Sequence, residues 1–549
     1  MSSAQFRVAI IAALALAPRA ASAQLTATER LRVDSVFARF DRTESPGCAV
    51  GISQRGRPVY VRGYGMADLQ NRIAIAPTSI FHVASISKQF TAISVALLAE
   101  EGKLSLDDDV RKHVSELHDY GVKLTVRQLI HHTSGLRDQW NLLRYAGWRG
   151  DDVITEGDVL DIISRQRGLN FKPGDEYVYS NTGYTLLAVI VKRVSGKSLR
   201  EFAEERIFAP LGMRDTHFHD DHTMIVPGRT SAYEPRSGGG WSISIPVFDT
   251  YGATSLFTTA EDLLTWEANL DTPRFGSPAL WRAAATSAAL NDGTPTNYGY
   301  GLVLARWRGQ EAIGHNGADA GYRSAVERYP AHALAIAVLC NLANSNPGAL
   351  LRSVATVLLE EKLPRPEVNV RAQPHVASRA ALEKWVGTYR DTVSHFVLRV
   401  SLAGDTIRAN GQTIALGSDT TGVLGTNPGW VALRAGPDGS MQIAVEPKAL
   451  RTTRFIRQDA AVTTPAALAA FAGSYYSAEL DVRYELVPRD STLVRTQRKM
   501  EDATLLPAGR DAFTAAGTAV LFTRDKRGKV ASFTVNDGRV RGVRFVRVP

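Results

Sequence analysis

The alternation of apolar and polar positions first marks one buried helix. Residues 89–101 are rich in apolar side chains and contain neither glycine nor proline. The larger apolar side chains recur at helical spacing and are Phe90, Ile93, Leu97 and Leu98. Gly102 stands where a helix C-cap belongs. The pattern therefore predicts a buried helix that starts near Ser85 and stops at Gly102.

Shorter apolar runs on both sides of this helix predict a sheet. The expected strands cover residues 48–53, 58–65, 298–305, 311–315, 322–329 and 334–341, and the expected helices cover 26–40, 185–194 and 347–362. Between them, residues 104–270 follow a broken helical pattern that predicts an all-α lobe. Strands at both ends of a helical insertion indicate a sandwich of sheet and helices with a second lobe. The cleft between the two parts is the natural place for a site.

The pattern changes after a proline-rich stretch, residues 364–378, which reads as a linker. Beyond it, short alternating strands recur about every 8–12 residues, and residues 382–389 resemble residues 468–475. We expect two small antiparallel barrels or curved sheets, at 379–458 and 465–549. Such units usually bind a ligand, cover another domain or act as spacers, and their sequences contain no catalytic pattern.

Composition and the N-terminal residues indicate the class of protein and its cellular location. The 549 residues are 44% apolar and 22% charged, which is typical of a soluble globular protein, and the formal net charge is +9. The chain has no lysine-arginine tract of the kind that indicates nucleic-acid binding. Its mild basicity fits an ordinary solvated surface. Residues 1–23 read as a secretory signal, with Arg7, the apolar run 8–17 and a cleavage site at Ala21-Ser22-Ala23. We expect an exported enzyme without a membrane helix, whose catalytic region covers 24–363.

Candidate chemistry begins where the first helix begins. Ser85 and Lys88 are three residues apart, so they share one helix face at about 5–6 Å between their Cβ atoms. A lysine in a dry pocket loses part of its preference for charge and can take the serine proton. The N–H groups at the helix start would point at an oxyanion formed by attack of Ser85 on a carbonyl. A motif this short also arises by chance.

Three further stretches are candidates for the same site. They are Tyr179-Ser180-Asn181, His315-Asn316-Gly317 at the end of an expected strand, and residues 129–136. Each also has an ordinary explanation: Tyr179 as a core aromatic, Asn181 as a helix cap and His315 as a histidine at a strand end.

Together, in this order, the motifs of residues 1–365 resemble the serine β-lactamase and penicillin-binding-protein superfamily in its class C-like branch. The resemblance implies an α+β fold in which helices flank an antiparallel sheet with an inserted helical lobe. It implies Ser85 as the acylated nucleophile, Lys88 and Tyr179 as proton-transfer partners, and Asn181 as the ligand of a substrate amide oxygen. The N–H groups of Ser85 and Ala318 would form the oxyanion hole, and His315, Asn316, Gly317 and Ala318 would line the substrate. The two extra β units resemble those of three-domain D-aminopeptidases.

The resemblance implies a serine hydrolase for small peptides, amides or esters, with D-amino-acid and peptidoglycan-derived peptides among the candidates. It implies no cofactor and leaves the oligomeric state open. His315 departs from the lysine of class C β-lactamases and would be a weaker, pH-dependent cation for a substrate carboxylate. This favours peptidase or esterase activity over a true β-lactamase, which stays an alternative. A non-catalytic binder of cell-wall peptides is another.

A zinc-dependent hydrolase is the third alternative. His217, His219, Asp221 and His222 have the spacing of a His-x-His-x-Asp-His zinc box, and these residue types can share a metal. The further ligands and the layering that such a site needs are not evident in the sequence, so we expect no catalytic metal.

The chain has two cysteines, Cys48 and Cys340. In the fold that the resemblance implies, their strands are antiparallel neighbours, which permits a disulfide in an oxidising compartment. Two unbonded cysteines that lie close together are the other possibility, because the register cannot be fixed from sequence.

Overall fold

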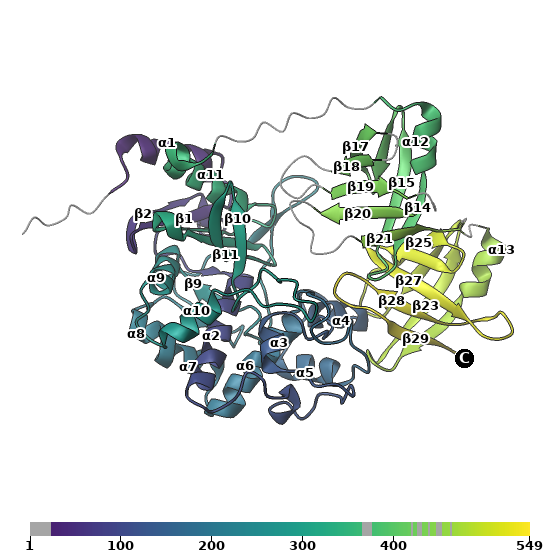
Figure 1. The fold of residues 1–549 in the computed structure, drawn as a ribbon, viewed down its shortest axis with the longest axis horizontal. Coiled ribbons are helices and arrows are strands. Elements are labelled where there is room, and N and C mark those ends of the chain that lie inside the picture. The colour runs from purple at the N-terminus through teal and green to yellow at the C-terminus, as the bar shows by residue number, and fades with distance from the viewer. Residues whose placement is uncertain are drawn as a thin grey trace, which may run out of the picture.

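The structure is a computed structural model that describes residues 24–364, 376–418, 421–424, 431–436, 440–445, 453–459, 461 and 464–549. The expected signal segment and most of the expected linker lie outside the described residues. The first part of the chain forms a sheet covered by helices and joined to a helical lobe, and two barrels follow (Figure 1). This confirms the predicted α+β class. No helix in the described ranges is long and apolar enough to span a membrane.

The central sheet has six strands in the order β10-β11-β12-β13-β1-β2, and every neighbouring pair is antiparallel. Its strands are β1 (Cys48–Gln54), β2 (Arg57–Tyr64), β10 (Val303–Trp307), β11 (Gln310–Asp319), β12 (Tyr322–Tyr329) and β13 (Leu334–Cys340). Side chains alternate between the two faces of a strand. Val50 and Ile52 pack in the core beneath α1 (Ala27–Phe37) and α11 (Pro347–Leu359), whereas Gly51 faces α9 (Ala260–Asp271).

The helical lobe is built around two buried helices, α2 (Ser87–Glu100) and α6 (Asn181–Ser195), which pack on each other. The other helices are α3 (Val126–Ile130), α4 (Gln139–Ala146), α5 (Glu156–Ser164), α7 (Leu199–Ala203), α8 (Ala209–Leu211) and α10 (Pro278–Ala284). Glu101 caps α2 and Gly102 follows with φ +71°, which confirms the predicted stop.

The lobe also contains strands, so the all-α prediction was wrong. Within residues 104–270, β6 (His217–Phe218) pairs with β9 (Leu256–Thr258), and β7 (Tyr233–Pro235) pairs with β8 (Trp241–Ile243). Earlier in the chain, β5 (Phe81–His82) also pairs with β9, and β3 (Met66–Asp68) pairs with β4 (Ile73–Ala74). These runs of two or three residues are too short to show a clear alternation in sequence.

Two predicted boundaries in the sheet region were also wrong. Residues 298–302 precede β10 as irregular chain instead of belonging to it. His315 does not end its strand, because β11 continues to Asp319 in register with β12. The polar residues 315–317 hid this continuation, since strand ends are read from the loss of apolar residues.

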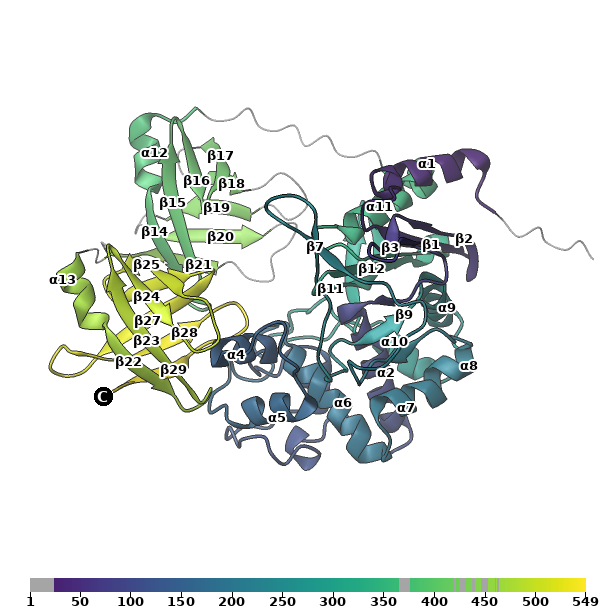
Figure 2. The ribbon, with the colours of Figure 1, turned by 180° about the vertical axis from the view of Figure 1, so that it is seen from behind.

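The C-terminal region forms two closed eight-stranded barrels, each preceded by a short helix (Figure 2). The first comprises α12 (Arg379–Trp385), β14 (Gly387–Asp391), β15 (Val397–Ala403), β16 (Thr406–Ala409), β17 (Gln412–Ser418), β18 (Thr421–Leu424), β19 (Val431–Ala435), β20 (Met441–Val445) and β21 (Thr453–Arg457). The second comprises α13 (Pro465–Leu468), β22 (Gly473–Ser477), β23 (Val482–Arg489), β24 (Thr492–Thr496), β25 (Ala503–Gly509), β26 (Ala512–Ala515), β27 (Thr518–Arg524), β28 (Val530–Asn536) and β29 (Val543–Val548).

The repeat seen in the sequence has a structural basis in these barrels. The Tyr389 hydroxyl donates to the Trp385 carbonyl at 3.0 Å, and the Tyr475 hydroxyl donates to the Phe471 carbonyl at 2.9 Å. Trp385 ends α12, and Phe471 ends the 3₁₀ turn Ala469–Phe471 that follows α13, so in both barrels the tyrosine ties the first strand to the helical segment before it.

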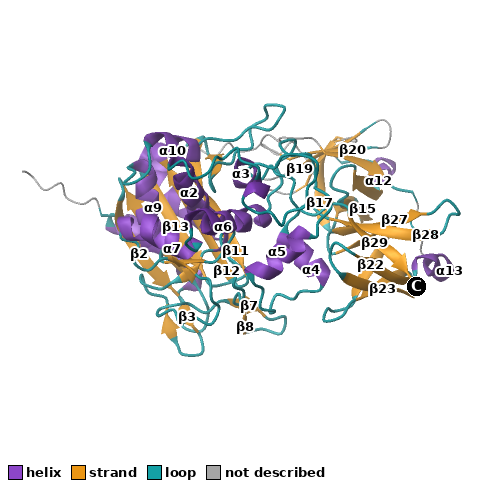
Figure 3. Ribbon diagram, turned by 90° about the horizontal axis from the view of Figure 1, so that it is seen from below, coloured by secondary structure: helices purple, strands orange, loops and turns teal. Residues whose placement is uncertain are grey.

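The second barrel packs against the helical lobe beside α4 and α5 (Figure 3). Tyr484 and Gln497 both donate to the carbonyl of Tyr145, the Tyr145 hydroxyl donates to Asp537, and Arg541 pairs with Glu176. Arg137, whose side chain is only 4% exposed, pairs with Glu479. Buried polar pairs at this boundary fix the position of the barrel relative to the lobe.

Cys48 and Cys340 are directly opposed on β1 and β13, and they form a disulfide. Of the two possibilities left by the sequence, the structure adopts the bonded one.

Candidate active site

Ser85 lies in a single 3₁₀ turn, Ala84–Ile86, that runs directly into α2. Ala84 has φ +49°, a backbone conformation that L-residues rarely adopt and that persists only where the surrounding structure holds it. The turn is held by β12, where the Ser324 hydroxyl donates to the Val83 carbonyl at 2.8 Å. Ser85 is thus presented on a strained, supported turn, with its side chain lining a cleft.

Lys88 lies one helical turn beyond Ser85, as the spacing predicts. Its Nζ lies 3.0 Å from Ser85 Oγ and also donates to Asn181 Oδ1 at 2.9 Å and to the Ala253 carbonyl at 2.6 Å. The side chain is completely buried. Burial lowers the pKa of the Lys88 amine to about 7, against the opposing effect of Asp138. Near neutral pH the amine therefore exists in both forms and can accept the serine proton.

Asn181 occupies the first turn of α6 and orients Lys88. Its backbone N–H and its Nδ2 both donate to Asp138 Oδ2, at 2.7 and 2.8 Å. This leaves Oδ1 pointing at the ammonium of Lys88. In this arrangement Asn181 positions the lysine; it also lines the cleft, and its contact with a substrate amide oxygen stays a prediction.

Tyr179 lies on the other side of the lysine, whose Nζ is 4.8 Å from the centre of the phenol ring. The phenol hydroxyl is buried and forms no hydrogen bond with the described residues. Burial raises the pKa of Tyr179 above its ordinary value, and the nearby Ser85 hydroxyl opposes this rise. Tyr179 is therefore a neutral phenol that could pass a proton between Ser85 and a leaving group.

The close approach of β11 to the Ser85 turn completes the arrangement. A Cβ atom at residue 317 would clash with the Val83 carbonyl and the Ser324 hydroxyl, so only Gly317 permits this contact. Asn316 and Ala318 are exposed on the cleft side of the same strand. The N–H groups of Ser85 and Ala318 remain the predicted oxyanion hole.

His315 is part of the site but differs from the expected cation. It is 7% exposed, and its two ring nitrogens contact the Asn316 carbonyl at 2.6 Å and the Tyr298 hydroxyl at 3.1 Å. One nitrogen can donate to the carbonyl while the other accepts from the phenol, which suits a neutral ring. Burial lowers the pKa of His315 to about 3. The expected pH-dependent anchor for a carboxylate is therefore not supported, because the ring stays neutral throughout the physiological range.

These residues open into one cleft of about 960 Å³. Its wall includes Ser85, Tyr179 and His315, and on the far side the loop 243–248 and α4. Arg539 from the second barrel also lines it, which was missed because the β units carry no recognisable catalytic pattern.

Comparison with known proteins agrees with this geometry. A family model described as Beta-lactamase matches residues 33–360. The chain belongs to the beta-lactamase family. Within the family it is a serine hydrolase, and Ser85, Lys88 and Tyr179 remain its predicted catalytic residues.

Curated family relatives named D-aminopeptidase match almost the whole chain. The protein from Brucella melitensis is 26% identical over 529 residues, covering 92% of this chain and 96% of its own length. The one from Gluconobacter oxydans is 26% identical over 534 residues, covering 94% and 98%. The similarity therefore extends through the C-terminal barrels.

Solved structures of the fold are also similar. The penicillin-binding protein homologue from Pyrococcus abyssi has a TM-score of 0.55 at 24% identity, covering 78% of this chain and 99% of its own. The D-amino acid amidase from Ochrobactrum anthropi has a TM-score of 0.51 at 22% identity, covering 61% and 100%. At these identities the likeness establishes the fold alone.

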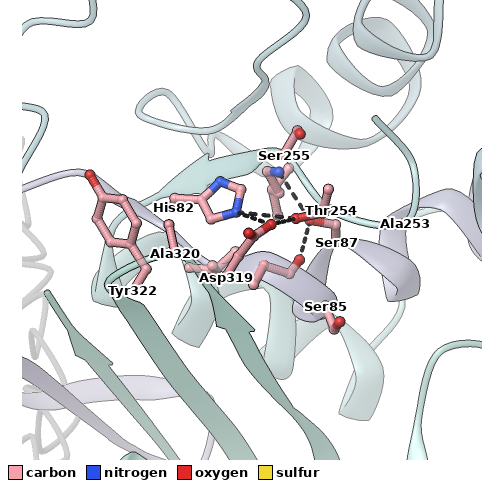
Figure 4. A network of polar contacts seen from close by, with 12 residues as sticks. His82, Ser85, Ser87, Ala253, Thr254, Ser255, Asp319, Ala320 and Tyr322 are labelled. Carbon is pink, nitrogen blue, oxygen red and sulfur yellow. Dashed lines mark hydrogen bonds and ion pairs between the residues drawn. The ribbon is translucent and has the colours of Figure 1, made fainter. Parts of the chain in front are cut away.

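A network of polar contacts lies beside Ser85 in this beta-lactamase-family enzyme (Figure 4). The sequence did not predict it. Asp319 Oδ2 accepts from the Thr254 hydroxyl at 2.8 Å and lies 3.2 Å from His82 Nε2. The Ser87 hydroxyl donates to the Ala84 carbonyl and accepts from the N–H of Leu256 at 3.0 Å. The network joins β11 and the loop before β9 to the turn that carries the nucleophile.

The zinc-box residues are not brought together. Among the described residues, the group that could share a metal is Asp221, His222 and Asp249. His217 and His219 instead pack their rings against Phe257, and burial lowers the pKa of each to about 4. The spacing in sequence therefore does not correspond to a four-residue cluster.

Proposed function

We propose that this serine hydrolase cleaves amide bonds in small peptides or amides that contain D-amino acids, and also small esters, through an acyl-enzyme. The observation that carries the proposal is the buried Lys88 amine 3.0 Å from Ser85 Oγ. Its pKa of about 7 lets it accept a proton at neutral pH. The names of the D-aminopeptidase relatives support amide substrates and the D-configuration.

In this mechanism Ser85 Oγ bonds to the substrate carbonyl carbon while its proton passes to Lys88. The oxyanion is stabilised by the N–H groups of Ser85 and Ala318. The bond to the leaving amine or alcohol then breaks, and that group takes a proton delivered through Tyr179. A water molecule attacks the acyl-enzyme by the reverse proton route and restores Ser85.

The cellular location is proposed on the sequence of residues 1–23 alone. Their apolar run and cleavage site support export to the periplasm or medium. Cleavage after Ala23, measured as the mass of the mature protein from an exporting host, tests this proposal.

A covalent adduct is the sharpest test of the serine mechanism. Incubation with a neutral fluorophosphonate should add one adduct to Ser85, located by peptide mass spectrometry, and Ser85→Ala should take up none. Hydrolysis of D- and L-alanine p-nitroanilides then tests the configuration. A chromogenic cephalosporin tests the β-lactamase alternative. A protein that takes up no adduct and cleaves none of these compounds would instead support the non-catalytic binder.

A further inference from the structure

A short turn of the second barrel enters the active-site cleft. Residues 537–542 link β28 to β29, and the carbonyl of Arg539 accepts from the Asp138 N–H at 3.2 Å and from Asn170 Nδ2 at 2.8 Å. Asp537 Oδ1 accepts from the N–H groups of Arg539 and Val540 at 2.7 and 2.8 Å. The backbone of Arg539 is therefore fixed to the catalytic lobe on one side and to its own barrel on the other.

The side chain of Arg539 extends over the predicted catalytic tyrosine. Its Cζ lies 5.0 Å from the centre of the Tyr179 ring, and the residue lines the same cleft as Ser85 and His315. The residue is exposed, and no carboxylate among the described residues pairs with its guanidinium. Its charge reaches the reacting groups, since it helps to lower the pKa of Lys88 and opposes the rise in that of Tyr179.

The other cations at the cleft already have partners. Lys88 is buried and holds three protein oxygens, Arg149 pairs with Asp151, and Arg144 lies 4.0 Å from Asp537. Asp319 accepts from Thr254.

Two further residues that line the cleft, Glu234 and His315, could also affect the charge that a substrate meets there. Glu234 on β7 also lines the cleft but forms no ion pair with Arg539. His315 is neutral, so it does not supply a cation. Among the arginines that line the cleft in the described part of the chain, Arg539 is therefore the one without an ion pair.

We propose that Arg539 binds an anionic group of the substrate, so that the enzyme prefers amides or esters carrying a carboxylate to those carrying a free amino group. A guanidinium binds a carboxylate through two parallel N–H···O bonds, and the position of Arg539 over the Tyr179 ring places that fork beside the reacting groups. A substrate ammonium at the same place would meet a like charge. This inference rests on the proposed hydrolase function and narrows its substrate class.

The carboxylate could belong to the acyl part of the substrate or to its leaving group. Two matched sets separate these cases: N-succinyl-, N-acetyl- and free-amine D-alanine p-nitroanilide for the acyl part, and N-acetyl-D-alanyl-D-alanine with its C-terminal amide for the leaving group. For each set, kcat/KM of the anionic compound is divided by kcat/KM of the neutral compound. If turnover is too slow, the same ratio is measured as the rate of Ser85 labelling by fluorophosphonates that carry a carboxylate, a methyl ester or an ammonium.

The variants are Arg539→Ala, Arg539→Lys and Arg539→Glu, with Arg544→Ala as the control because Arg544 is an exposed arginine on β29 of the same barrel. The backbone hydrogen bonds of the turn do not involve the replaced atoms, and unchanged melting temperatures would verify folding. We expect the anionic-to-neutral ratio to fall about 10- to 100-fold in Arg539→Ala, as for the loss of a charge-assisted hydrogen bond. Arg539→Lys should lie between, and Arg539→Glu should prefer the free-amine compound.

A fall in either set supports the proposal and identifies the side of the substrate. Ratios within twofold of wild type for all three variants in both sets and in the labelling rates would overturn it. Failure of Ser85 to be labelled at all would instead overturn the proposed function, so the two failures are distinguishable.

Discussion

The pH dependence of the reaction should report the protonation of Lys88. An amine with an ordinary pKa of about 10.4 is neutral in roughly one molecule per 2,500 at pH 7. Burial lowers the pKa of Lys88 to about 7, so about half of the molecules carry the neutral amine at that pH. The structure therefore increases the fraction able to accept the Ser85 proton roughly 1,000-fold.

With a neutral ester substrate, kcat/KM should rise about tenfold for each pH unit below about 7 and become constant above it. The sign follows from the role of Lys88 as a base, which is active only when deprotonated. His131 and His315 are poor alternative sources of this rise, because burial lowers the pKa of His131 to about 4 and that of His315 to about 3.

Two variants should move the rising limb of the pH profile, the part below about pH 7 where kcat/KM increases with pH, in opposite directions. Arg539→Ala removes a cation that lowers the pKa of Lys88, so the limb should move to higher pH. Asp319→Asn removes an anion that raises it, so the limb should move to lower pH. A profile that is flat from pH 5.5 to 9, or two shifts of the same sign, would refute the assignment of Lys88 as the base.

Three other outcomes are expected. Ser85→Ala should lose hydrolysis by at least a thousandfold while keeping its melting temperature, and a folded variant with full activity would contradict the serine mechanism. Cys340→Ser should lower the free energy of unfolding by about 2–5 kcal/mol in urea titrations, since the disulfide closes a loop with a sequence separation of 292; an unchanged midpoint would count against this. Burial raises the pKa of Glu267 to about 8 in the folded protein. Its contribution to the free energy of unfolding is therefore fully present below about pH 4.5, where the unfolded chain is also protonated, and is lost as pH rises through 8. Glu267→Gln should therefore raise stability by about 3 kcal/mol at pH 7 and little at pH 4.5, and a variant less stable than wild type at pH 8 would refute this.

Elements with long, regular patterns were predictable. The run after Ser85 became α2 with its stop at Gly102, and residues 322–329 became β12 with the same bounds. The short strands of two or three residues were not predictable, because so few residues show no clear alternation. The continuation of β11 past His315 was not predictable either, because its polar residues interrupt the apolar pattern. Ser85 and Lys88 were predictable for a similar reason, since one helix brings them together.

The properties of His315 and Arg539 depend instead on contacts between distant parts of the chain. The charge expected for His315 was wrong because the ring is buried and both of its nitrogens have partners, and the contact with Tyr298, which lies before β10, does not follow from the local sequence. Arg539 is remote in sequence from Tyr179, and the two meet because the turn after β28 bonds to Asp138 and Asn170 of the catalytic lobe. The same Asp138 holds Asn181, which in turn holds Lys88. The barrel that supplies the cation is thus connected to the base through two hydrogen-bonded residues, Asp138 and Asn181, so its docking bears on both substrate charge and catalysis.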